Sequence, residues 1–282
     1  MKGEGQPRAR GASIRVPLPA PDASLSGLSR GTLAKLAKLG IASKFDLVLH
    51  LPLRYDDETR LYSLSEAPVG QPVLVEGAVV EADIKYRPRR QLICHIEDGS
   101  GVLTLRFFNF YPSQVKQLTA GARLRAFGEI RHGFLGPEMV HPKYRLVQAE
   151  APVARALTPV YPTTAGLAQD ELRRLIARAL ADSDLADTLS SSVVEPLGLP
   201  PFRDAVLLLH NPPPEIPQAA LTGRTHPAWR RVKFDELLAQ QISMRVHYRR
   251  RKAAGAPALT PRGTLAQALL GRLPFKLTTA QN

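Results

Sequence analysis

The change of hydrophobic period between residues 72 and 146 constrains the fold more than any other feature of the sequence. Apolar and polar residues alternate there along short runs, and a period of two is typical of half-buried strands. A helical segment is expected at 112–119, between the third and fourth runs. The expected strands cover 72–86, 91–98, 102–110, 121–131 and 137–146. Five strands with a helix at that point predict an α+β chain built around a five-stranded OB-fold barrel.

Two details of this region are predicted from single residues. Gly77 interrupts the first expected strand, which indicates a bulge or a bend there. Pro142 interrupts the fifth, because proline cannot donate to the ladder.

Helical periodicity flanks the expected barrel on both sides. Residues 24–52 predict a hairpin of two helices that divides at Gly40, with Ser43 as the N-cap of the second helix and Pro52 at its end. Further helices are expected at 166–183, 202–210 and 226–252. The chain thus divides into a disordered basic tail (1–23), a helical segment (24–65), the barrel (66–150), a helical linking region (151–255) and a final segment (256–282).

The net charge of +13 at pH 7 is distributed unevenly. Residues 81–145 hold 11 Lys and Arg against 6 Asp and Glu, and residues 224–252 hold 9 against 2. Residues 146–223 hold 5 against 9. A surface that is charged only for solubility mixes both signs. The segregation therefore favours an anionic polymer as partner, most commonly a nucleic acid, over a general arginine-rich composition.

Several kinds of protein are not favoured. The sequence has no run of about 18 apolar residues and no secretory signal, so we expect a cytoplasmic protein with no membrane partner. The single cysteine, Cys94, excludes an intramolecular disulfide and a multi-cysteine zinc site. The sequence contains neither GxxxxGK[ST] nor GxGxxG, and its His and acidic residues show no catalytic spacing. We therefore expect no catalytic residue and no metal site in this chain.

Residues 107–111, FFNFY, hold four of the 17 aromatic residues of the chain. Alternation predicts that Leu103, Leu105 and Phe107 face the barrel interior, and that the opposite face carries Thr104, Arg106, Phe108 and Phe110. Phe108 and Phe110 are therefore expected on an outer face or at the end of the strand. Two phenylalanines beside an arginine suit either a contact with a neighbouring domain or the stacking of unpaired bases, which is worth roughly 1–3 kcal/mol per base.

The expected hairpin tip between the first two strands reads KYRPRRQ and is strongly basic. OB-folds bind nucleic acid with this loop and with the face of the second and third strands. Its cations would contact phosphates without reading sequence, although a charged tip can also serve solubility alone. The candidate binding residues of the tip are Lys85, Tyr86, Arg87, Arg89 and Arg90.

Six stretches carry a resemblance to a known family, in order over nearly the whole chain from about residue 24. They are DLVLHLPLRYDDET (46–59), IEDGSGVLTLRFFNF (96–110), GEIRHGFLGPEMVHPKY (128–144), LTPVYPTTAGL (157–167), LLLHNPPP (207–214) and HPAWRRVKFDELLAQQ (226–241). Together they resemble the N-terminal part of the bacterial RecG helicases, which remodel stalled replication forks and Holliday junctions by branch migration.

The resemblance implies a role for the barrel and a set of partners. In this family an OB-fold wedge splits a fork or junction, and two motor lobes follow that translocate on duplex DNA with ATP and Mg²⁺. The wedge aromatic matches Phe108, and Tyr111 is a candidate for the second stacking aromatic. The implied partner is branched DNA, with a single-stranded-DNA-binding protein as a further one. A monomer in the bacterial cytoplasm, associated with the nucleoid, is expected.

The final residues, LPFKLTTAQN, resemble the start of the first motor lobe. Gln281 matches the glutamine that contacts adenine in such helicases, and Phe275 matches the aromatic upstream of it. The resemblance implies a shortened form that binds no ATP or Mg²⁺ and is inactive as an ATPase alone. The alternative, from a different class, is a stand-alone OB-fold module that binds single-stranded DNA or a protein.

Overall fold

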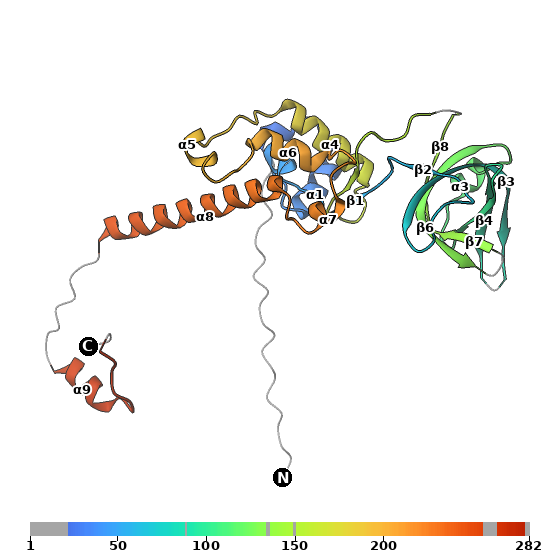
Figure 1. Ribbon diagram of the computed structural model, residues 1–282. Coiled ribbons are helices and arrows are strands. Elements are labelled where there is room, and N and C mark those ends of the chain that lie inside the picture. The colour runs from blue at the N-terminus through green and yellow to red at the C-terminus, as the bar shows by residue number, and fades with distance from the viewer. Residues whose placement is uncertain (1–21, 88, 134–135, 149–150, 256–263, 280–282) are drawn as a thin grey trace, which may run out of the picture. The chain divides into compact units, whose positions relative to one another are not determined.

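The computed structural model describes residues 22–87, 89–133, 136–148, 151–255 and 264–279. The chain separates into two compact units, residues 1–233 and 234–282. Figure 1 shows a β-barrel and a helical body in the first unit. Nearly all of the expected tail lies outside the described residues, and the five sequence ranges proposed as domains stay predictions.

Five strands form the barrel: β3 (Pro72–Lys85), β4 (Gln91–Glu97), β5 (Val102–Phe107), β6 (Arg123–Gly133) and β7 (Gly136–Val140). They pair in the order β3-β4-β5-β7-β6, and β6 pairs again with β3, which closes the ring. Only the β5–β7 pair is parallel among these five. Helix α3 (Pro112–Gln117) joins β5 to β6. The α+β class and the OB-fold barrel predicted from the sequence are confirmed.

Two short strands extend this sheet. Strand β2 (Leu61–Tyr62) runs parallel to β3, and β8 (Lys143–Leu146) runs antiparallel to β6. The fifth expected strand is therefore two strands, because the chain turns at His141, where φ is +51°, and at Pro142. The expected interruption at Pro142 is confirmed.

The barrel interior is a single apolar core. Leu103, Leu105 and Phe107 are 1%, 0% and 3% exposed, so the period-two assignment of the third strand is confirmed up to Phe107. The strand ends there, however, and not at Phe110. The buried members of this core are Leu64, Val73, Val75, Val79, Leu92, Cys94, Ile96, Leu103, Leu105, Phe107, Leu118, Leu124, Ala126, Ile130 and Met139.

The bulge in β3 lies at Val80 and not at Gly77. The register of β3 against β4 shifts between Val79 and Glu81, whereas Gly77 pairs regularly with Leu124 of β6. Gly77 is needed for another reason. A Cβ atom there would lie 2.9 Å from the carbonyl oxygen of Glu97, so the missing side chain allows β3 and β4 to approach closely.

The helical body begins with the two-helix hairpin. Gly40 has φ +78° after the first helix, and the Ser43 side chain accepts the backbone N–H of Asp46 in a capping box, as expected. The second helix ends at Val48, where Leu49 caps it, and therefore does not extend to Pro52 as predicted. These elements are η1 (Ala23–Leu25), α1 (Arg30–Lys38) and α2 (Lys44–Val48).

The rest of the body follows the barrel in sequence. The three later helices predicted from periodicity are confirmed as α4 (Gln169–Asp182), α6 (Phe202–His210) and α8 (Pro227–Ala254). Short helices α5 (Ser191–Val194) and α7 (Gln218–Thr222) lie between them. The strands β1 (Arg54–Asp56) and β9 (Thr158–Val160), which the sequence did not predict, pair antiparallel and join the segments before and after the barrel.

One core unites these segments. Leu36 and Val48, from before the barrel, pack in the same buried cluster as Leu172, Ile176 and Val206 from after it. The barrel is thus an insertion in the sequence of the helical body. The second unit holds the later part of α8 and helix α9 (Leu265–Arg272).

Candidate nucleic-acid interface

The segment that follows β5 carries the candidate stacking residues. Phe107 is the last residue of the strand and is buried, whereas Phe108 is half-buried and Asn109 is exposed. The backbone N–H of Phe108 donates to Nε2 of His141 at 3.3 Å. The two rings lie 5.6 Å apart between centroids and are tilted by 59°. Phe108 is therefore held at the end of the barrel by a residue from the β7–β8 connection.

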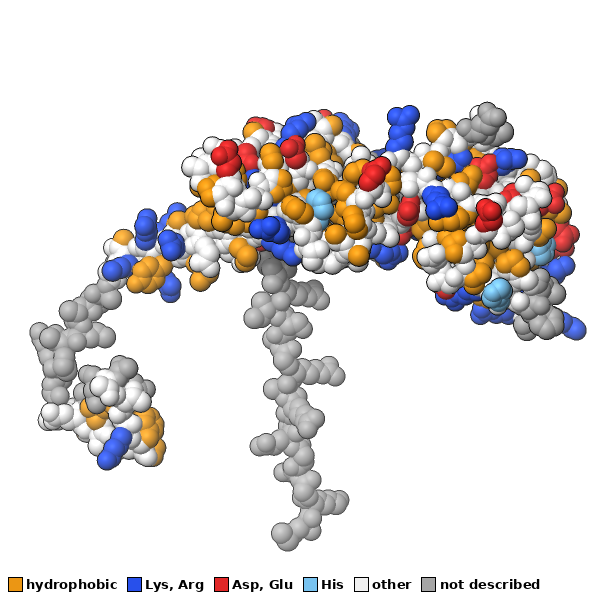
Figure 2. Space-filling view, viewed as in Figure 1, with side chains coloured by type: hydrophobic (Ala, Val, Ile, Leu, Met, Phe, Trp, Pro, Cys, Tyr) orange, Lys and Arg blue, Asp and Glu red, His pale blue; other side chains and the backbone are white. Residues whose placement is uncertain are grey.

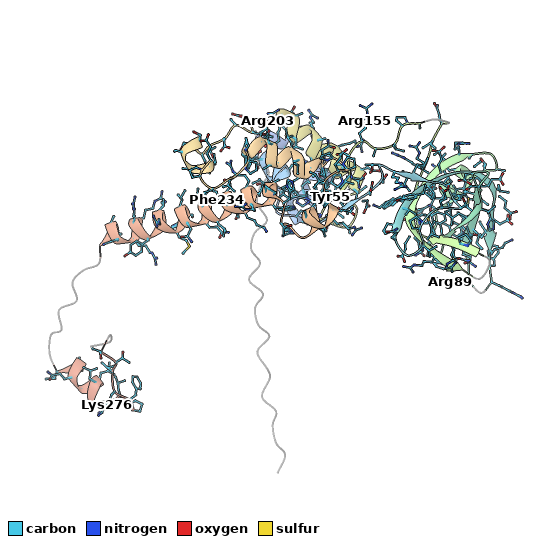
Figure 3. The ribbon with its side chains drawn as sticks, in the orientation of Figure 1. Tyr55, Arg89, Arg155, Arg203, Phe234 and Lys276 are labelled. Atoms are coloured by element: carbon cyan, nitrogen blue, oxygen red, sulfur yellow. The ribbon has the colours of Figure 1, made fainter. Side chains whose placement is uncertain are left out.

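Arginines of the β3–β4 hairpin pack against the same aromatic segment. The Arg89 Cζ atom lies 3.5 Å from the centroid of the Phe108 ring, and the Arg90 Cζ atom lies 4.5 Å from the centroid of the Phe110 ring. Both are cation–π contacts, in which the positive guanidinium meets the negative face of the ring. The structure thus brings four of the predicted binding residues into one cluster, at the end of the barrel where Arg89 is labelled (Figure 3).

Phe110 differs from Phe108 in what it contacts. It is half-buried and packs against the barrel core, together with Val115 of α3. Phe110 therefore contributes to the fold on one side and to the Arg90 contact on the other.

Tyr111 is the most exposed aromatic of this segment. Its side chain is 74% exposed, and its residue is the N-cap of α3. The Tyr111 backbone N–H donates to Oε1 of Gln114 at 2.9 Å, and Pro112 occupies the first turn, so the backbone at this position is fixed by the helix start. The ring itself is accessible to a ligand.

The remaining hairpin residues are open to solvent. Lys85 ends β3 and pairs with Asp83 at 3.1 Å on the surface. Tyr86 is 70% exposed, and Arg87 is exposed as well. Figure 2 shows Lys and Arg side chains gathered at this end of the barrel. Exposed cations that flank accessible rings are the arrangement that suits an unpaired strand, because phosphates and bases alternate along it.

Arg106 lies apart from this open surface. Its guanidinium donates to Oε2 of Glu138 at 2.7 Å and to Oε1 of Gln91 at 2.8 Å, and its side chain is 19% exposed. The residue therefore ties β5 to β7 and β4 across the outer face of the barrel. Its predicted contact with DNA would require these partners to be replaced.

Sequence reasoning missed His141 and the role of the hairpin arginines as ring partners. A residue before proline is expected to be extended, so nothing indicated the left-handed backbone of His141. The contact also joins positions 33 residues apart, which no local pattern connects.

The expected adenine contact is only partly within the described residues. Phe275 lies in the second unit and is 59% exposed, whereas Gln281 lies outside the described residues. Within the described part of the chain, no group of three or more His, Cys, Asp and Glu residues could hold a metal ion. Among the helices described, none is both long enough and apolar enough to cross a membrane.

Comparisons with known proteins point to one family. A family model described as the RecG wedge domain matches residues 26–182. The chain is 42% identical over 268 residues to the ATP-dependent DNA helicase RecG of Escherichia coli (strain K12), and 37% identical over 267 residues to that of Haemophilus influenzae. Both alignments cover 93% of this chain but 38% of the relative, so the chain spans about 38% of the length of the curated relatives it matches.

A solved structure gives a similar result. The structure of RecG bound to a three-way DNA junction superimposes with a TM-score of 0.59 at 25% sequence identity. The match covers 96% of this chain and 37% of that one.

Proposed function

Because the chain belongs to the RecG family, of which it contains the wedge domain region, we propose that its barrel binds the branch point of forked or junction DNA. The observation that carries the proposal is the cluster at the end of the barrel, where two rings of an aromatic segment meet the arginines of a basic hairpin. The similar RecG structure bound to a three-way DNA junction supports it.

The proposed mechanism is steric and electrostatic. Phe108 stacks on a base at the branch point, where pairing ends and a π-face becomes available. Tyr111, three residues further and exposed, offers a second ring for the displaced strand. Lys85, Arg87 and Arg89 contact backbone phosphates whatever the DNA sequence. These contacts hold the DNA arms while the barrel keeps them apart.

The activity of the whole protein is a further part of the proposal. Joined to motor lobes, the wedge would take part in ATP-dependent remodelling of stalled forks and Holliday junctions in DNA recombination and repair. We propose that the protein acts there as a monomer in the bacterial cytoplasm, with a single-stranded-DNA-binding protein as a second partner. The sequence holds no phosphate-binding loop, so we assign ATP and Mg²⁺ to that full-length activity.

The test compares Phe108→Ala with wild type on a three-way fork and on linear duplex of equal length. We expect roughly tenfold weaker binding to the fork and little change on the duplex, since base stacking is worth about 1–3 kcal/mol. Phe45→Ala, which removes an exposed aromatic from α2 outside both basic segments, is the control. An equal loss of affinity for the fork and for the linear duplex would contradict the wedge role.

The alternative is distinguished in the same experiment. A stand-alone module for single-stranded DNA would prefer plain single strands to three-way forks in competition, at every salt concentration. Because both candidates bind phosphates, salt dependence alone does not separate them.

A further inference from the structure

We propose that His141 is a positioning residue that sets the Phe108 ring for the branch point. The inference rests on the proposed function of Phe108 and adds to it a residue from another part of the barrel. It starts from the end of the β5–β7 ladder, where the backbone stops supplying hydrogen-bond partners.

The ladder explains why a side chain is needed. Arg106 of β5 pairs with Val140 of β7, and the next residue, His141, donates its backbone N–H to the carbonyl oxygen of Arg106 at 2.8 Å. The chain then leaves the ladder, because His141 has φ +51° and Pro142 follows. No carbonyl of β7 continues beside Phe108. The imidazole Nε2 accepts the Phe108 N–H at 3.3 Å in its place.

The imidazole also connects the surface ring to the core. Its centroid lies 5.6 Å from that of Phe108 and 6.3 Å from that of Phe107, against which it packs edge to face at 83°. Phe107 is 3% exposed and cannot move without disturbing the barrel. His141 thus fixes Phe108 at two points, the backbone N–H and the ring.

The backbone of His141 supports a role for its side chain. A φ of +51° lies in the left-handed region, which glycine adopts without steric cost and in which a residue with a Cβ atom is strained. Such strain at a surface position is explained when the side chain does something that glycine could not. Here the side chain supplies the acceptor and the ring contact.

Two matched substitutions isolate the acceptor. His141→Gln and His141→Leu carry the same backbone strain, but only glutamine has an oxygen that can reach the Phe108 N–H. A third variant, His141→Gly, removes the strain and the acceptor together. His132→Leu, which removes an exposed histidine of β6, is the control.

The readouts are hydrogen exchange of the Phe108 amide by NMR and the ratio of affinities for fork and linear duplex. We expect faster exchange in the leucine and glycine variants and restoration by glutamine. The ratio of fork affinity to duplex affinity should fall roughly three- to tenfold in the leucine and glycine variants, because the loss of one hydrogen bond has about this effect. The ratio should recover in part in the glutamine variant.

The outcomes separate this inference from the proposed function. Wild-type exchange and selectivity in His141→Leu would overturn it, as would a glycine variant that gains stability and keeps full selectivity. If Phe108→Ala loses selectivity while His141→Leu does not, only the role of His141 fails. If Phe108→Ala keeps selectivity, the proposed function itself fails.

Discussion

The guanidinium of Arg89 lies against the ring of Phe108, with Cζ 3.5 Å from the ring centroid. This is van der Waals contact, so no base fits between them. A base that stacks on that face must displace the guanidinium, and a neighbouring phosphate is the natural new partner for the cation. Arg89 therefore has a partner to exchange when DNA binds, whereas Arg87 of the same hairpin has no ring contact of this kind in the described structure.

The first prediction compares these two arginines. Arg87→Ala and Arg89→Ala each remove one cation, so each should reduce the slope of log K against log salt by up to about 0.9 if it meets a phosphate. Arg89→Ala also uncovers the ring, and binding no longer has to break a cation–π contact worth about 0.5–1 kcal/mol. We therefore expect Arg89→Ala to lose less fork affinity than Arg87→Ala in a salt series by fluorescence anisotropy. Identical losses would contradict the displacement.

The barrel could be predicted because its signals are local. The period of two in 72–146 and the helical segment at 112–119 describe neighbours in sequence. They sufficed for the succession of strands and helix typical of an OB-fold and for the inward position of Phe107. The signals for the end of the first helix at Gly40 and the start of the second at Ser43 were equally local, since each acts within one turn.

The surroundings of Phe108 could not be predicted in this way. Its partners come from 19 residues before and 33 residues after it, and they meet only because the barrel closes. The alternation holds only up to Phe107, where β5 ends. Phe108 and Phe110 therefore lie at the end of the strand, one of the two positions expected for them, and not on its outer face. The bulge expected at Gly77 lies instead at Val80, and the close approach to Glu97 that requires glycine could not be predicted because it is a contact between strands.

The second prediction concerns that approach. In Gly77→Ala the new Cβ would lie 2.9 Å from the Glu97 carbonyl oxygen and 3.2 Å from Cβ of Ile96, so β3 and β4 must separate. We expect a loss of about 1–3 kcal/mol in the free energy of unfolding, measured with urea. Gly31→Ala is the control, because its Cβ would meet only the Ser29 hydroxyl at 3.7 Å within α1. That variant should be neutral or more stable by up to about 1 kcal/mol; an equal loss in both would refute the steric account.

The third prediction is a pH dependence centred on His210. Burial lowers the pKa of His210 from 6.5 to about 4, and nearby His50 adds to this. The neutral ring is well satisfied: Tyr161 Oη lies 2.8 Å from Nδ1 and donates to it, and Nε2 donates to the Val48 carbonyl oxygen at 2.8 Å. Because the pKa of His210 is lower in the folded than in the unfolded state, this contribution to stability is full above pH 6.5, falls progressively as the pH drops below 6.5, and is lost by about pH 4.

The expected size follows from the shift. A fall from 6.5 to about 4 corresponds to about 3 kcal/mol of unfolding free energy between neutral pH and pH 4. Other groups titrate in the same range, so the comparison is with His210→Gln, which keeps a donor and an acceptor but no charge. The variant should lose less stability than wild type over that interval in urea titrations. Parallel curves for the two proteins would show that His210 does not carry the effect.

The last prediction separates the two phenylalanines that follow β5. Phe110 packs against the barrel core, so Phe110→Ala should lower the free energy of unfolding by about 1–3 kcal/mol, part of the 3–5 kcal/mol of a fully buried ring. Phe108 is held at the surface by Arg89 and His141, and Phe108→Ala should cost less than about 1 kcal/mol of stability. Fork binding should show the reverse order, measured under conditions in which both variants are folded. If Phe110→Ala were the more damaging to fork selectivity while leaving stability unchanged, the stacking role would belong to Phe110, and Phe108 would serve the fold.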